Sequence, residues 1–292
     1  PDVVGLVGMQ PRAVLISLPT QPRSDLDVSY GSDAIDQPFP DTDNTTVDDG
    51  WSVLSGTSAA APQAAGVAAL LLGRYPSLTP MAVKNVLENS AVDVTSGSSA
   101  TGDTAGPGWD AATGSGLICG QAAIDYLTPG TFDAYIRRGT GQGAALSGAS
   151  PDIIVRTSAV RRPQVVLGLT VKHRCDLCDP AHDGQDNYIY LRVQNRGALP
   201  GRATATVYFA GTPRSWTKLS SIGQLDIRNL RPGEFRVVGP LVWRADIPGP
   251  GHSLIAILDS ADDRAPNLTR VQNARDFMHR VYRSNNVAWR EV

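Results

Sequence analysis

The chain is poor in the features that mark small disulfide scaffolds and membrane proteins. Its three cysteines in 292 residues are too few for a disulfide framework. No apolar run reaches the ~18 residues that would span a bilayer, because the longest candidate, 59–72, is interrupted by Pro62, Gln63 and Gly66. The net charge of −2 gives no reason to expect a nucleic-acid or an anionic-membrane partner.

The sequence does not open with methionine and shows no signal-peptide pattern. Its first residues, 1–5 (PDVVG), read as the middle of a protein rather than its start. We therefore expect processing, or a further segment before Pro1. The length suggests two domains, or one large domain with an appendage.

Residues 1–127 are rich in Ala, Gly, Ser and Asp. Within them, 12–18 reads as a short strand. The polar residues 19–50 follow, with many Asp and no Lys, and predict a long surface loop. We expect the acids of this loop to form a solvated surface; the alternative is that they favour basic substrates or bind a second cation.

Two helices are predicted after that loop. Residues 58–75 are apolar on nearly all sides, which predicts a helix buried in a large core. Thr79 and Pro80 provide an N-cap and a proline at the first helical position, and they predict a second helix to about residue 91.

The amino-acid composition changes after residue 127. Residues 128–150 are Gly-rich and read as a linker. The region 151–292 then contains short β-rich runs separated by Gly, Pro and Asn, a pattern that indicates an all-β sandwich of about seven strands. These runs are 153–155, 165–171, 188–194, 203–209, 235–238 and 254–258.

The octet Ser-Gly-Thr-Ser-Ala-Ala-Ala-Pro, residues 55–62, has the features of a nucleophile segment. A nucleophilic serine needs a reachable hydroxyl, a base and donors for the oxyanion. Ser58 would stand at the first turn of the apolar helix, beside a backbone N–H and the positive end of the helix dipole. Gly56 would permit a close approach of the substrate backbone. The alternative is an ordinary serine at the start of an Ala-rich helix.

The octet resembles the Gly-Thr-Ser-x-Ala-x-Pro signature of the subtilase and sedolisin superfamily, and the resemblance extends over residues 1–127. It implies an α/β, three-layer subtilisin-like domain with a parallel sheet, incomplete in this chain, followed by an immunoglobulin-like β-sandwich. It also implies a serine endopeptidase acting on a protein or peptide substrate, with Ser58 as the catalytic residue. Ser55, Gly56 and Thr57 would then bind the substrate.

The superfamily places its remaining catalytic residues upstream of the serine, as Asp and His or as Glu and Asp. All four histidines of this chain lie in the β-rich half, and none matches a catalytic motif: His173, His182, His252 and His279. We therefore expect an N-terminal peptidase segment, or a separate chain, to supply the base. An inactive peptidase-like scaffold that acts through its β-sandwich is the alternative function.

A calcium site is implied by a second part of the resemblance. Sedolisins follow the serine helix with an Asp-Ile/Val pair and a Gly-x-Gly-x-Asp segment that bind calcium. The matching ligands here would be the side chains of Asp93 and Asp110 and the carbonyls of Val94, Gly106 and Gly108. The alternative is a polar loop whose Asp residues cap turns.

A Cys-x-x-C pattern lies in the β-rich half. Cys175 and Cys178, with His173 and His182, could form a zinc site. The spacing is not that of a known zinc finger, so a disulfide or two thiols is the alternative. We expect a secreted or extracellular protein, although a cytoplasmic one is also compatible with the sequence.

Overall fold

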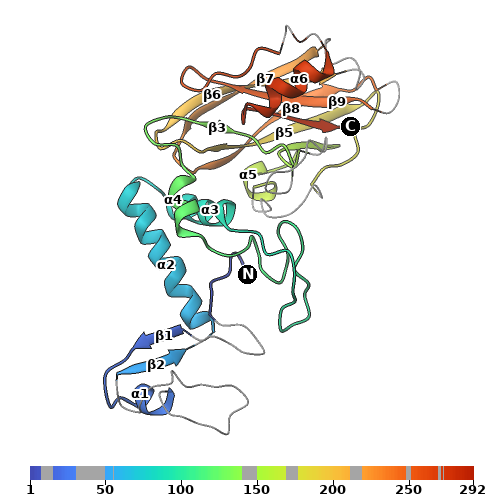
Figure 1. Cartoon of the computed structure of the whole chain (residues 1–292). Helices are drawn as coiled ribbons and strands as arrows, with labels where there is room; N and C mark the ends of the chain where they lie inside the picture. The colour runs from blue at the N-terminus through green and yellow to red at the C-terminus, as the bar shows by residue number, and fades with distance from the viewer. Residues whose placement is uncertain are drawn as a thin grey trace.

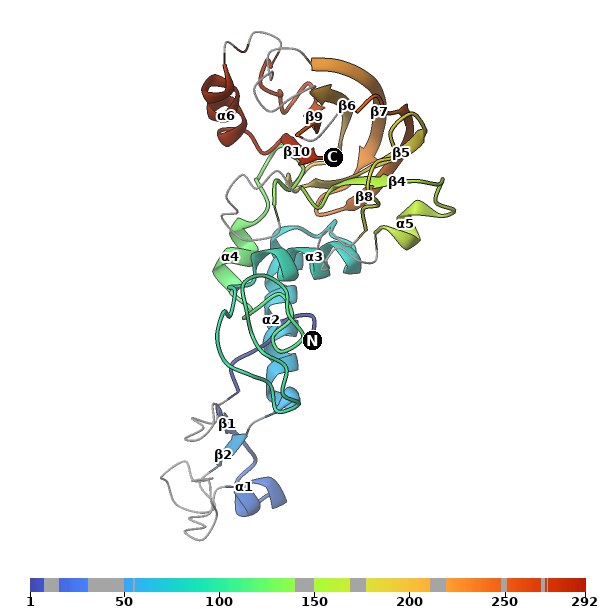
Figure 2. The same ribbon diagram turned by 90° about the vertical axis from the view of Figure 1, so that its right-hand side faces the viewer.

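The computed structural model describes residues 1–7, 16–30, 50–54, 56–139, 150–168, 177–210, 219–247, 251–268, 271 and 273–292. A β-sandwich occupies one end of the molecule, three helices lie in the middle, and a small β-hairpin with one short helix lies at the other end (Figure 1). Seen from the side, the same order runs along the long axis of the molecule (Figure 2). Ser55, Cys175 and His173 lie outside the described residues.

The three middle helices are α2 (Thr57–Arg74), α3 (Pro80–Ser90) and α4 (Gly120–Asp125). The start of α3 is the one that the sequence predicts, because the Thr79 hydroxyl accepts a hydrogen bond from the N–H of Ala82 at 3.2 Å and Pro80 opens the helix. The helices share a small core. It consists of Leu71, Tyr75, Leu78, Ala82, Val83, Val86, Ala123 and Leu127.

The sequence predicts that α2 is buried in a large core, but the structure does not show this burial. Only Ala59 and Leu71 are buried among its 18 residues, while Leu70 and Leu72 are 58% and 41% exposed. The prediction fails because α3 and α4 pack against one side of the helix only, through its C-terminal half. Apolar residues therefore remain on the other sides of α2 without cover from the described part of the chain.

The hairpin at the far end consists of β1 (Ile16–Pro19) and β2 (Trp51–Leu54), with α1 (Asp25–Tyr30) between them. The two strands pair antiparallel, with Ile16 opposite Leu54. The predicted parallel sheet is not seen among the described residues of 1–127, where the one parallel pairing is an isolated bridge between Val4 and Leu117. A parallel sheet needs several strands joined by crossover connections, and those strands are not present in this part of the structure.

Asp27 closes the acid-rich loop. Its buried carboxylate accepts hydrogen bonds from the N–H groups of Arg23 at 2.8 Å and Gly50 at 3.1 Å. This acid therefore ties the two ends of the hairpin together, in contrast to the solvated surface that the sequence suggests for the loop.

The described strand β1 begins at Ile16, and most of the predicted strand 12–18 lies outside the described residues.

The β-sandwich consists of two antiparallel sheets of four strands each, plus two helices. One sheet has the strand order β10-β9-β6-β7, and in the other β5 pairs with β3, β4 and β8. The bounds are β3 (Ala134–Tyr135), β4 (Ile153–Arg156), β5 (Asp186–Asn195), β6 (Gly201–Ala210), β7 (Leu219–Leu230), β8 (Phe235–Arg244), β9 (Ser253–Asp259), β10 (Val287–Glu291), α5 (Pro163–Val166) and α6 (Ala274–Tyr282).

Side chains from both sheets form the core of the sandwich, and α6 covers the outer face of the first sheet through Phe277 and Val281. Part of the stretch that reads as a linker belongs to this core, because β3 pairs with β5 and its neighbours Phe132 and Ile136 are buried. The predicted strand 165–171 instead begins inside the short helix α5.

None of the helices in the described part of the chain combines the length and the apolar composition needed to cross a bilayer.

Glu88 of α3 makes the stability of this fold depend on pH. Its carboxyl lies 3.7 Å from the Lys84 ammonium and its side chain is 7% exposed. Burial raises the pKa of Glu88 from 4.5 to about 7, although Lys84 lowers it in part. As the pH rises from 4.5 to 7, the unfolded chain releases this proton first, so the folded state loses stability.

We expect Glu88→Gln to be more stable than the parent at pH 8 by about 1–3 kcal/mol, because the variant buries no charge. At pH 4 the two proteins should unfold at the same urea concentration. Glu291→Gln, an exposed position on β10, is the matched control. A difference of the same size at both pH values would contradict the prediction.

Candidate active site

Ser58 is the second residue of α2 and is exposed to solvent. The helix is preceded by Gly56, whose φ of 95° lies in the left-handed region that favours glycine. The Gly56 carbonyl accepts hydrogen bonds from the N–H groups of Ala59 and Ala60, at 3.0 and 3.2 Å. This turn brings the serine hydroxyl to the open end of the helix.

The start of α2 has no side-chain cap. The first N–H groups of a helix have no intrahelical acceptor, and the helix dipole adds partial positive charge there. Thr57 and Ser58 are both exposed at this end, and no hydrogen bond of the Ser58 hydroxyl is found within the described residues. The arrangement therefore combines a reachable hydroxyl with N–H donors that can face a developing negative charge.

The segment 1–7 lies along the first turns of α2. The Gln63 side-chain amide donates hydrogen bonds to the carbonyls of Leu6 at 2.8 Å and Ala59 at 3.0 Å. Gly5 passes so close to the helix that a Cβ there would lie 3.2 Å from Ala60. The sequence motif does not reveal this contact of Gln63, which supports the helix one turn beyond Ser58.

The described histidines all belong to the sandwich. His252 is buried and its ring stacks on Phe209 at 5.3 Å, His279 is part of α6, and His182 precedes β5. Figure 1 shows β2 and the start of α2 at the opposite end of the molecule from the sandwich. The described residues therefore do not bring a histidine to Ser58.

The loop after α3 brings together most of the residues expected to bind calcium. The Asp110 carboxylate accepts hydrogen bonds from the N–H of Gly106 at 2.9 Å, and from the N–H and hydroxyl of Thr113 at 2.7 and 3.0 Å. The Asp93 carboxylate accepts one from the N–H of Gly108 at 2.8 Å. Thr113 is a partner that sequence reasoning missed.

This geometry is that of a turn-capping network. Burial raises the pKa of Asp110, but the hydrogen bonds from Gly106 and Thr113 outweigh it and hold the pKa below its ordinary value. The glycines direct N–H groups, not carbonyls, at the carboxylates, and the described residues contain no group of three His, Cys, Asp or Glu that could hold a metal ion.

One oxygen of Asp93 is nevertheless buried without a hydrogen-bond partner among the described residues. Val94 makes no recorded hydrogen bond to the network in this part of the chain. Calcium binding by the loop thus stays a prediction, for which Asp93 offers one available ligand atom.

The suggested zinc site cannot be assembled from the described residues, which exclude His173 and Cys175. The Cys178 thiol lies 3.4 Å from the carbonyl of Ile153 on β4. His182 exchanges backbone hydrogen bonds with the side chain of Asn187, at 2.9 and 2.8 Å.

Comparison with known proteins finds a subtilase family model, Peptidase S8, that matches residues 31–116. Fervidolysin from Fervidobacterium pennivorans is 36% identical over 112 residues, which are 38% of this chain and 14% of that protein. The chain therefore spans only a small part of the length of this relative.

Two solved structures overlap with the chain only loosely. The crystal structure of fervidolysin, described as a keratinolytic enzyme related to subtilisin, gives a TM-score of 0.29 at 13% identity, covering 90% of this chain and 45% of that one. A CARDB domain from Pyrococcus furiosus, in complex with di-metal ions, gives 0.23 at 19% identity, covering 38% and 74%. These scores are too low to establish a shared arrangement.

We expect Asp110→Ala to lower the free energy of unfolding by about 1–3 kcal/mol, because two backbone N–H groups and a hydroxyl lose their acceptor. The loss should persist in a calcium chelator, since the network needs no metal. Thermal unfolding with and without calcium measures both effects. Asp262→Ala, at an exposed position on the sandwich, is the control. If the chelator removed the whole difference in stability between the parent and Asp110→Ala, the result would contradict the capping role.

Proposed function

We propose, from the premise that this chain contains a subtilase-family peptidase region at residues 31–116, that it contributes the nucleophile of a serine endopeptidase. Ser58 is that nucleophile. The observation that carries the proposal is the position of its exposed hydroxyl in the first turn of α2, two residues after a glycine with positive φ.

The chemistry of acyl transfer assigns each group a role. The Ser58 hydroxyl oxygen attacks the scissile carbonyl carbon while a general base accepts its proton, and the resulting oxyanion is held by the backbone N–H of Ser58. The base then returns the proton to the leaving amine, and the acyl-enzyme is hydrolysed by water. Ser55, Gly56 and Thr57 precede the nucleophile and bind the backbone of a protein or peptide substrate.

The general base comes from outside the described chain, from an upstream peptidase segment or a separate polypeptide. Two observations support this. The described histidines belong to the sandwich. The sides of α2 away from α3 and α4 expose apolar residues such as Leu70, which a folded peptidase domain would bury. The complementary segment would therefore both cover α2 and bring the base to Ser58.

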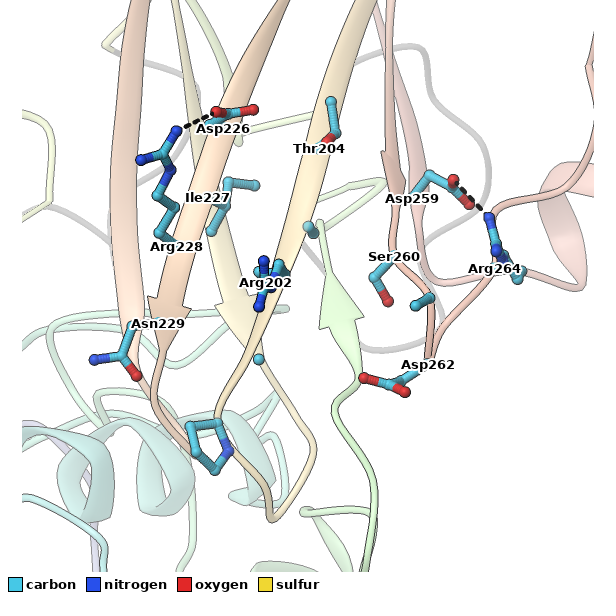
Figure 3. A pocket seen from close by; sticks show the side chains of 14 residues that line it. Arg202, Thr204, Asp226, Ile227, Arg228, Asn229, Asp259, Ser260, Asp262 and Arg264 are labelled. Atoms are coloured by element: carbon cyan, nitrogen blue, oxygen red, sulfur yellow. Dashed lines mark hydrogen bonds and ion pairs between the residues drawn. The ribbon is translucent and has the colours of Figure 1, made fainter.

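The second candidate function is a peptidase-like scaffold that acts through its sandwich. A groove of 1140 Å³ on β6, β7 and β9 favours it (Figure 3). Ion pairs line two sides of this groove, Arg228 with Asp226 at 2.9 Å and Arg264 with Asp259 at 3.5 Å, and Arg202 stands between them. A polar ligand or partner would fit such a lining better than an apolar one.

A fluorophosphonate probe separates the two functions. In the intact assembly with the complementary segment, we expect the probe to label this chain, and Ser58→Ala to abolish the labelling, because the probe reacts only with an activated serine. Ser77→Ala, an exposed serine beyond the other end of α2, should be labelled like the parent. The measurement is in-gel fluorescence followed by mass spectrometry of the labelled peptide.

Labelling that survives Ser58→Ala, or an intact assembly that takes up no probe, would rule out the catalytic proposal and favour the scaffold. Secretion of the protein stays a prediction, independent of this experiment.

A further inference from the structure

The C-terminal end of α2 is attached to the start of the sandwich. Tyr75, the residue that ends the helix, is buried, and its hydroxyl donates a hydrogen bond to the carbonyl of Leu127 at 3.1 Å. Leu71 and Leu127 belong to the same small core. The end of the helix that carries Ser58 thus contacts Leu127. The next residue, Thr128, makes the first backbone contact with the sandwich.

That backbone contact is an isolated parallel bridge between Thr128 and Gly197, which lies in the turn after β5. The N–H of Thr128 donates to the carbonyl of Arg196 at 2.7 Å, and the N–H of Ala198 donates to the carbonyl of Thr128 at 2.9 Å. Gly197 lies so close that a Cβ there would be 2.2 Å from the carbonyl oxygen of Thr131. Any side chain at this position would separate the two segments.

Arg196 fills the junction with its side chain. Its guanidinium carbon lies 4.4 Å from the ring centroid of Tyr126 and 4.9 Å from that of Tyr135. Its Nε is buried and has no hydrogen-bond partner among the described residues, so the two ring faces are its principal contacts. The Tyr126 hydroxyl in turn donates to the side-chain oxygen of Gln194 on β5 at 2.9 Å.

A second contact lies at the turn between β7 and β8. Gly233 of this turn has a φ of 65°, and a Cβ there would lie 3.0 Å from the Cβ of Ala82 on α3. The Asn85 side chain, also on α3, donates to the carbonyl of Gly233 at 3.4 Å. One turn of the sandwich therefore contacts the segment that follows α4 and the other contacts α3, and these two separate contacts oppose hinge motion at the junction.

We propose that the β-sandwich is a fixed brace for the serine helix, and that Arg196 is a positioning residue that acts through Tyr126 and the core around Leu127. Helix α2 is held at its C-terminal end by the core that it shares with α3 and α4, and near its first turns by segment 1–7, and the brace acts through the C-terminal contacts. The brace itself follows from the junction alone. Its effect on catalysis by Ser58 rests on the function proposed above.

Hydrogen exchange of the full chain tests the brace. In Arg196→Ala, amides of 67–75 and 120–127 should exchange faster by on the order of tenfold, while those of β6 and β9 keep the parent rates. Arg196→Lys, which retains a cation between the rings, should recover part of the protection. Arg202→Ala is the matched control, because Arg202 is an exposed arginine only six residues further along.

Unchanged exchange in 67–75 with a folded sandwich would overturn the proposal, and so would an equal effect of Arg202→Ala. If Arg196→Ala does not fold, Tyr126→Phe decides, since it removes only the hydrogen bond to Gln194. A smaller acceleration, about two- to fivefold, confined to the same segments is then expected, and its absence would overturn the brace.

The catalytic consequence is measured separately in the intact assembly. Arg196→Ala should lower kcat on a peptide substrate and leave KM nearly unchanged, because the junction lies near the C-terminal end of α2 and the proposed substrate site lies at the start of this helix. Figure 1 shows these two ends of α2 well apart. Altered exchange without a change in kcat would limit the brace to a structural role and overturn the positioning role of Arg196. Failure of the proposed function would instead show as absence of Ser58 labelling, whatever the exchange rates.

Discussion

The burial of one end of α2 is the constraint on which the rest of the structure depends. Its C-terminal half packs on α3 and α4, and Tyr75 ties the helix end to Leu127. From there the backbone continues directly into the pairing with the sandwich at Thr128. Without this buried end, the contacts of segment 1–7 with its first turns would be the remaining support that the described residues give to a largely apolar helix.

The two ends of this helix have opposite environments, and each suits its role. The C-terminal end is surrounded by aromatic and aliphatic side chains that exclude water, which gives it a defined position. The N-terminal end is open, uncapped by any side chain and preceded by a glycine with positive φ. A nucleophile needs an accessible hydroxyl with N–H donors beside it, which leaves the support of the helix to segment 1–7 beside its first turns and to its buried C-terminal end. In the function proposed here, the junction around Arg196 would strengthen the support at the C-terminal end.

Local sequence features predicted what local chemistry decides. Thr79 and Pro80 begin α3 as expected, because an N-cap and a proline act within one helical turn. Alternation in the β-rich half indicated strands that the structure contains at 188–194 and 203–209. The burial of α2 could not be predicted in this way. Its apolar composition shows that the helix needs cover, but not whether the described chain supplies that cover. Residues 128–136 looked like a linker because two-residue strands such as β3 have no sequence periodicity to detect.

The sequence by itself provides the motif at 55–62 and the match of residues 31–116 to the subtilase family model, because such a short run of residues can be recognised without any tertiary contact. Only the tertiary structure decided where that helix is held. Arg196 meets Tyr126 just after α4, and Gly233 meets Ala82 of α3, although the partners in each pair are distant in sequence, because the turns of the sandwich lie against this part of the chain. Likewise, the capping role of Asp110 depends on the direction of the N–H groups of Gly106 and Thr113, and backbone direction at a glycine cannot be inferred from the order of residues.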